Sequence, residues 1–149
     1  MSLATDSIFI GALQQDADLM EQVGGRLYGT AIPLPDEDAD NTPPPYVIVT
    51  FDGLNNQSQT KDNPYDDDED NVQIGIEVTG ETLEQLHGLT RHVRRTIGAY
   101  LSESGQDDGI YDTTFSADAI QYDPMKPCYW QVLHYQCSVQ TNEEDYEQD

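Results

Sequence analysis

A strictly alternating strand, followed almost at once by a long amphipathic helix, limits the folds that this chain can adopt. Residues 72–78 read VQIGIEV, which places four aliphatic side chains on one face and glutamine, glycine and glutamate on the other. Over residues 81–102, apolar side chains recur at helical spacing and form one stripe from Leu83 to Leu101. We therefore expect this helix to cover one face of the sheet that contains the strand.

Similar signals along the rest of the chain indicate an α+β fold. A helical pattern spans 3–23, with Asp6 or Ser7 as candidate caps, and strand-like runs lie at 46–52, 110–122 and 128–141. The order of helix, two strands, helix, two strands predicts a mostly antiparallel sheet of about four strands, with two main helices packed on one face. We expect a single domain over 1–141 and an acidic C-terminal tail over 142–149.

Two polar segments interrupt these elements. Residues 29–45 carry five prolines and an acidic run, which predicts a loop. Residues 53–70 separate two strands that a two-residue turn could join, so they predict a long hairpin arm. A connection of this length without its own structure is often functional in a compact domain.

The charge balance excludes one large class of function. The chain has 29 acidic residues against 6 basic ones, a formal net charge of −23, and only two lysines. General nucleic-acid binding through a basic face needs many Lys and Arg side chains, so it is excluded. The acidic residues are spread along the whole chain, which favours adaptation to molar salt, where charge repulsion is screened. Mimicry of DNA stays open as an alternative.

Neither a membrane segment nor a disulfide is expected. No stretch approaches the 18 apolar residues of a membrane span, and the start of the chain lacks a basic region typical of a signal peptide, so we expect a soluble protein that is intracellular at synthesis. Cys128 and Cys137 lie in one predicted strand, where they would be about 30 Å apart, too far to bridge. We interpret both as small apolar side chains.

The residues that usually carry catalysis or bind metals do not form a recognisable motif. The acidic run from Asp66 resembles a calcium loop, but Asn71 stands where the sharp turn needs glycine. His87 and His92 are five residues apart, which does not place them on one helical face. We expect no enzyme activity, no metal site and no cofactor.

Arginines supply most of the positive charge, and two groups of them matter. Arg91, Arg94 and Arg95 lie on the exposed side of the helix at 81–102, where they either pair with carboxylates of the same chain or dock on an acidic neighbouring subunit. Arg26 follows the helix-ending Gly24-Gly25 pair, where its side chain could bind carbonyl or carboxylate groups and hold the turn.

The order of segments resembles the tail-completion proteins of long-tailed viruses, also called tail terminators or head–tail joining proteins. The resemblance covers roughly residues 8–141 and is sharpest in GGRLY, which includes Tyr28, and in PPPYVIVTF. It continues through the polar arm, the run VQIGIEVTGETLEQLHGLTRHVRRTI and the aromatic closing strand YWQVLHYQCSVQ. The extreme acidity and the acidic insertions at 36–41 and 62–70 depart from the pattern.

The resemblance implies a structural role in the virion. Subunits of such proteins form a homo-oligomer, a hexameric ring, that stops growth of the tail tube and joins it to the head–tail connector or stopper protein. Viral DNA would pass through the lumen without specific binding, and no membrane would be involved. The composition adds a haloarchaeal virus as the source, with synthesis in the host cytoplasm. Residues at the ring interface would then include the following: Arg91, Arg94, Arg95, Gln57, Thr60, Lys61 and Tyr65.

Two other functions stay open at this point. Another neck component, such as a head-side stopper or adaptor, would share the same virion context. A small acidic DNA mimic would instead act as a monomer or dimer with carboxylates spaced like phosphates.

Overall fold

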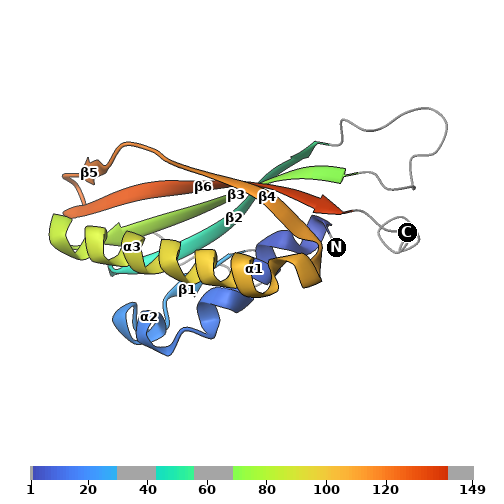
Figure 1. Cartoon of the computed structure of the whole chain (residues 1–149). Helices are drawn as coiled ribbons and strands as arrows, with labels where there is room; N and C mark the ends of the chain where they lie inside the picture. The colour runs from blue at the N-terminus through green and yellow to red at the C-terminus, as the bar shows by residue number, and fades with distance from the viewer. Residues whose placement is uncertain (1, 30–42, 56–68, 141–149) are drawn as a thin grey trace.

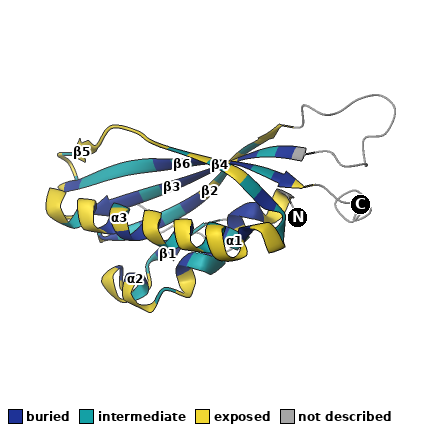
Figure 2. Cartoon of the chain, viewed as in Figure 1, coloured by how far each residue is buried: buried dark blue, intermediate teal, exposed yellow. Residues whose placement is uncertain are grey.

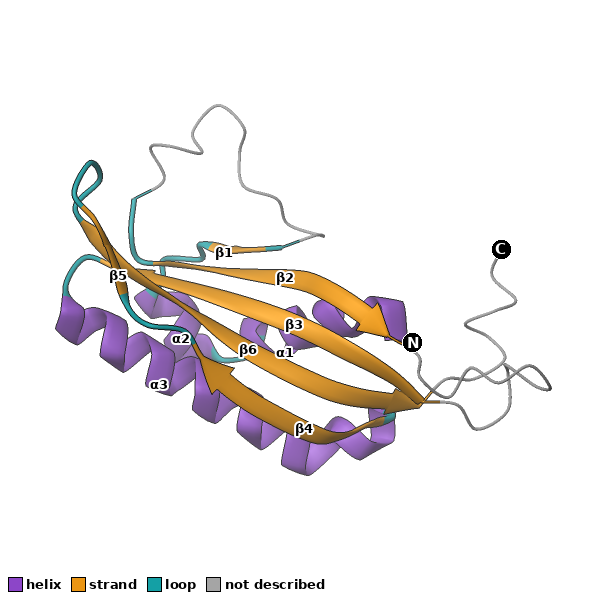
Figure 3. Ribbon diagram, turned by 90° about the horizontal axis from the view of Figure 1, so that it is seen from above, coloured by secondary structure: helices purple, strands orange, loops and turns teal. Residues whose placement is uncertain are grey.

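The chain forms a two-layer α+β fold, with helices covering one face of a twisted sheet (Figures 1 and 3). The computed structural model describes residues 2–29, 43–55 and 69–140. The helical elements are a 3₁₀ turn Ser2–Ala4, α1 Thr5–Gln14, α2 Ala17–Gln22, α3 Leu83–Tyr100, a π turn Leu101–Gly105 and a 3₁₀ turn Gln106–Asp108. The strands are β1 Leu27–Tyr28, β2 Tyr46–Asn55, β3 Glu69–Gly80, β4 Ile110–Ala117, β5 Gln121–Asp123 and β6 Cys128–Gln140.

The sheet is antiparallel except at one edge. Its order is β1-β2-β3-β6-β4, and β5 pairs with β6 on the same side as β4. β3 and β6 pair along their whole lengths, from Glu69 opposite Gln140 to Gly80 opposite Tyr129. Only the two-residue β1 runs parallel to its neighbour. β3 is therefore the middle strand of the sheet, and β6 is paired with β3 on one side and with β4 and β5 on the other.

The alternation in β3 sets which face is buried, as the sequence predicted. Its four aliphatic side chains are fully buried under the helices, and so are Val47 and Val49 of β2 (Figure 2). α3 supplies the opposing apolar stripe with Leu86, Leu89, Val93 and Ile97, all buried. Leu83, the first residue of the predicted stripe, is instead 43% exposed because it begins the first turn of α3, next to the N-cap Thr82.

The sequence prediction was wrong about the continuity of two elements, the strand at 110–122 and the helix at 3–23. The run at 110–122 is two strands, and with the short β1 the sheet has six strands rather than about four. β4 contains a bulge where Asp112 adopts a φ of 50°, and residues 118–120 leave the strand before β5 begins. A bulge bends an edge strand and makes it a poor template for further pairing.

The helix expected over 3–23 is broken into α1 and α2 at Gln15 and Asp16. Asp16 ends the first helix because its side chain caps the second, accepting a hydrogen bond from Leu19 N at 3.1 Å. Asp6 and Ser7 lie inside α1, and the cap position is Ala4, whose side chain makes no cap bond. The expected caps were therefore displaced by a 3₁₀ entry turn.

A double-glycine turn connects α2 to the sheet. Gly24 and Gly25 have φ values of 59° and 76°, which L side chains rarely adopt, and Gly25 N donates to Met20 O at 2.9 Å. Arg26 Nε donates to the Pro45 carbonyl at 3.0 Å, across to the start of β2. The Tyr28 ring packs edge-on near Tyr46, with centroids 6.4 Å apart. The turn thereby places β1 beside β2, the strand with which it pairs.

Candidate assembly surface

The outer side of α3 carries a basic patch formed by Arg91, Arg94 and Arg95. All three are exposed, because the buried residues of the helix occupy the opposite side. Within the described residues, none of the three has a carboxylate oxygen within 4.0 Å. The patch is thus available for an acidic or carbonyl-rich partner, and intramolecular ion pairing with the described part of the chain does not account for it.

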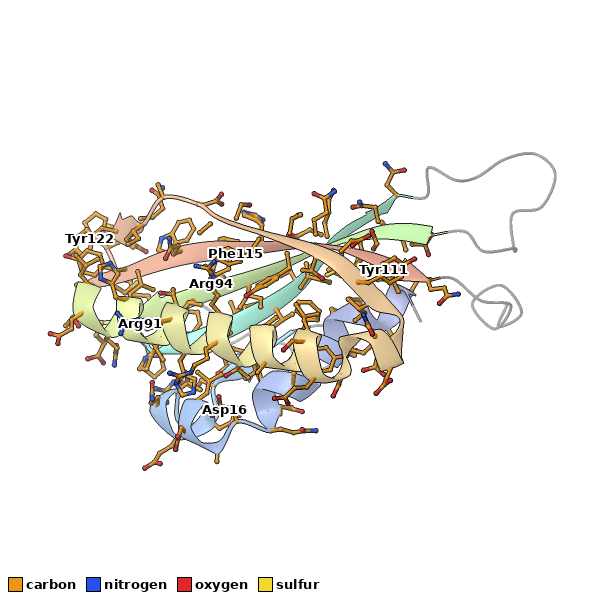
Figure 4. The ribbon with its side chains drawn as sticks, viewed as in Figure 1. Asp16, Arg91, Arg94, Tyr111, Phe115 and Tyr122 are labelled. Carbon is orange, nitrogen blue, oxygen red and sulfur yellow. The ribbon has the colours of Figure 1, made fainter. Side chains whose placement is uncertain are left out.

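Arg94 is nevertheless held in place by an aromatic ring. Its guanidinium carbon lies 4.2 Å from the centroid of Phe115, which β4 brings over from the edge of the sheet (Figure 4). Phe115 in turn packs against Tyr135 of β6, with centroids 5.2 Å apart. This stack orients the Arg94 side chain and bridges α3 to the edge strand.

Two hollows flank the Arg94–Phe115 bridge between α3 and the sheet edge. The larger, which we call the α3–β4 groove, has a volume of about 470 Å³. It is lined by Arg94, Gly98, Leu101, Ser102, Gln106, Ile110, Tyr111, Asp112, Thr113, Phe115 and Tyr135. The second hollow, of about 340 Å³, lies toward His87 and Arg91. The two hollows share Arg94 and Phe115 as a common wall.

Tyr135 lies on the sheet under this bridge and has an unusual hydroxyl. The residue is 4% exposed, and its hydroxyl oxygen has no hydrogen-bond partner among the described residues. Burial raises the pKa of the Tyr135 phenol to about 12, although the nearby Arg94 charge opposes the rise. A buried donor without a partner is unfavourable, so this hydroxyl marks a place where the isolated subunit is incompletely satisfied.

A second polar cluster ties α2 to α3. Asp16 Oδ2 accepts hydrogen bonds from Thr96 Oγ1 at 2.5 Å and His92 Nε2 at 2.7 Å, while Gln22 lies 3.4 Å from His92 Nδ1. Burial opposes ionisation of Asp16, but the hydrogen bonds from Thr96, Leu19 N and His92 outweigh it and lower the pKa. Sequence analysis missed this cluster because its members lie 76 and 80 residues apart, without a local pattern.

Further ionisable groups lie on the strands and on the segment after β4. His134 Nε2 lies 2.9 Å from Asp118 Oδ2, and burial raises the pKa of Glu77 on β3. In the described ranges, no three His, Cys, Asp or Glu side chains are placed to hold a metal ion. Cys128 and Cys137 are buried and free, as predicted.

Four predicted interface residues belong to the segment between β2 and β3. Gln57, Thr60, Lys61 and Tyr65 lie outside the described residues, as do the calcium-like positions at 66 and 68 and the acidic tail at 142–149. Asp70, which was part of the calcium-like pattern, is buried in β3. None of the helices in the described ranges is long and apolar enough to cross a bilayer.

The fold has a counterpart in a virus-like particle. Comparison with models of protein families gave no match, and neither did comparison with curated proteins. Among solved structures, the chain is similar to a chain of the "virion of native gene transfer agent (GTA) particle", with a TM-score of 0.59 and 12% sequence identity. The likeness covers 89% of this chain and 91% of that chain. At this identity, it shows a shared fold.

Proposed function

We propose that this protein is a structural component of a virion, without catalytic activity, in which copies of the chain form a closed ring. The observation that carries the proposal is the end-to-end likeness to a chain of a gene transfer agent virion, which covers nine-tenths of both chains. The likeness spans most of both chains, so it concerns the overall fold and not one shared motif.

The surface of the described residues supports an assembly role. Half of all the cations in the chain gather on one side of α3, and no carboxylate of the described residues neutralises them. In a chain with a net charge of −23, contacts between copies are repulsive unless cations offset the charge at the interface. The Arg91, Arg94 and Arg95 patch is suited to that task.

We further propose a position at the head-proximal end of a tail. There the ring, of six copies, would terminate the tail tube and join it to the head–tail connector or stopper. DNA would pass through a lumen whose negative charge favours sliding over binding. The sequence resemblance to tail-completion proteins supports this finer assignment, and the composition supports a virus of a salt-loving host.

The proposal is tested with purified protein in 3 M KCl, measured by light scattering and native mass alone, with tail-tube protein and with connector protein. Rings that bind the tube end and limit tube length are expected. A ring that binds only the connector would indicate a different neck component. A monomer or dimer that binds neither partner but inhibits a nuclease would contradict the virion role and favour a DNA mimic.

A further inference from the structure

Strand β5 and the residues on either side of it gather exposed apolar side chains on this acidic surface. Met125 is 92% exposed and Tyr122 51%, and with Ile120 they make up three of the six large apolar side chains exposed in the described ranges. Residues 119–127 contain one acidic and one basic residue, Asp123 and Lys126, so this segment is neutral within a chain of net charge −23. We call residues 120–126 the hairpin tip.

The hairpin tip is held in a fixed shape. Asp123 Oδ1 accepts hydrogen bonds from the backbone N–H groups of Met125, at 3.0 Å, and Lys126, at 3.4 Å. The Tyr122 ring packs against Tyr129 with centroids 4.9 Å apart, and Lys126 Nζ lies 5.4 Å from the Tyr46 ring. An apolar protrusion that is already ordered loses little conformational freedom when it docks.

The α3–β4 groove offers a matching concave surface. Its volume of about 470 Å³ is lined by apolar atoms of Leu101, Ile110 and Phe115, with the unpartnered Tyr135 hydroxyl buried beneath. Gly98 opens one wall, because a Cβ built there would meet nothing within 4 Å. Arg94 and Asp112 both line the groove, so its lining carries no net charge, unlike the acidic chain as a whole.

Within one copy, the tip and the groove cannot meet. Tyr122 is paired with Tyr129 on β6, whereas Phe115, the groove residue nearest to the tip along β6, is paired with Tyr135. Six residues of strand separate these positions, about 20 Å. Figure 4 shows Tyr122 at one end of the molecule and Tyr111 of the groove at the other. A contact between tip and groove therefore joins two molecules head to tail.

We propose that the hairpin tip of one copy packs into the α3–β4 groove of the next, with Met125 entering the groove beside Arg94. This inference rests on the proposed function only in requiring that copies associate. A protrusion at one end and a hollow toward the other form a heterologous contact, which closes into a ring when its rotation permits.

Two pairs of matched variants test the contact in molar salt. Gly98→Phe fills the groove, whereas Gly88→Phe adds the same side chain at another exposed glycine of α3 that also has open space. Met125→Glu charges the tip, whereas Leu3→Glu charges an apolar side chain that is 72% exposed outside it. Gly98→Phe and Met125→Glu should each weaken association about tenfold or more, with unchanged melting, and the controls should assemble as wild type.

A mixing experiment distinguishes loss of the tip–groove contact from general damage to the folded protein. Met125→Glu copies keep an intact groove and Gly98→Phe copies keep an intact tip, so an equimolar mixture has one functional contact per pair. The mixture should therefore form heterodimers and stop there, as measured by native mass. A double variant Met125→Cys, Gly98→Cys should form disulfides between copies under mild oxidation, because the proposed contact brings the two positions together. The native cysteines are buried and should not compete.

The outcomes separate this inference from the proposed function. If wild-type rings form and both groove and tip variants assemble normally, the contact is wrong and the ring proposal stands. Disulfides that form only within single chains would also contradict the contact. If wild-type protein stays monomeric in molar salt, alone and with tail-tube and connector proteins, both proposals are wrong.

Discussion

At the scale of single residues, Asp16 has more structural roles than any other described carboxylate. It caps α2, accepts hydrogen bonds from two side chains of α3, and occupies the break between α1 and α2. Helix α2 is only six residues long and has Leu19 as its one fully buried side chain, so it depends on this carboxylate for its position.

Replacing Asp16 with asparagine should destabilise the fold by about 1–3 kcal/mol at pH 7, the usual cost of losing charged hydrogen bonds at a partly buried site. Asparagine caps helices as well as aspartate does. The loss of stability therefore measures the contribution of the contacts with His92 and Thr96. Denaturant unfolding measures the difference. Asp18→Asn, an exposed carboxylate in the first turn of α2, is the control and should change stability by less than about 0.5 kcal/mol.

The difference in stability between wild type and Asp16→Asn should depend on pH. The folded pKa of Asp16 lies below its usual value of 3.8, so its contribution is fully present above that value. This stabilisation is lost as pH falls through the lower folded pKa, because protonation of the folded Asp16 carboxylate then removes its ionic hydrogen bonds. The gap between wild type and Asp16→Asn should therefore narrow below about pH 4. A gap that stayed constant down to pH 2 would contradict an ionised Asp16.

At the scale of elements, α3 combines an apolar inner side with a basic outer side, and the two sides should respond differently to mutation. The Arg94→Glu, Arg95→Glu variant removes the Arg94–Phe115 contact, worth about 0.5–1 kcal/mol at an exposed site, and should leave folding nearly intact. Assembly should be lost, because every interface between subunits of a ring would contain the same two reversed charges.

The two single variants show how much each arginine contributes to assembly. Arg94 lines both hollows and Arg95 lines neither, so Arg94→Glu should weaken assembly more than Arg95→Glu. Light scattering and thermal melts in molar salt measure assembly and folding separately. A double variant that assembles normally but melts much earlier would show that these arginines stabilise the subunit and not the ring.

The elements also show which parts of the fold could be predicted from the sequence. Strict alternation in β3 and helical spacing in α3 located the buried faces, because local periodicity reports burial directly. The breaks at Asp16 and at 118–120 were missed, since each depends on partners brought in by the fold, such as Thr96 for Asp16 and Val132 O for Asp118 N. The basic patch was visible in the sequence, but the Phe115 that orients it lies 21 positions from Arg94 and could not be assigned.

At the scale of the whole molecule, net charge governs the conditions in which the fold is stable. A chain with a net charge of −23 repels itself at low ionic strength, and the Debye length falls from about 10 Å at 0.1 M to about 3 Å at 1 M salt. The melting temperature should therefore rise between 0.1 M and 3 M KCl. Calorimetry or circular dichroism measures it, and a flat or falling melting temperature would contradict the adaptation to salt.

The position of β6 between β3 and the edge strands β4 and β5 has a consequence for the order of events during synthesis. β3 pairs with β6 along its full length, β4 and β5 pair with the opposite edge of β6, and β6 is made after all of them. The first hairpin and α3 leave the ribosome before the strand that joins β3 to β4 and β5, and long-range pairing of this kind is slow to form. Nascent chains that end before Cys128 should therefore stay open to proteases, and protection should appear in one step once residue 140 has emerged.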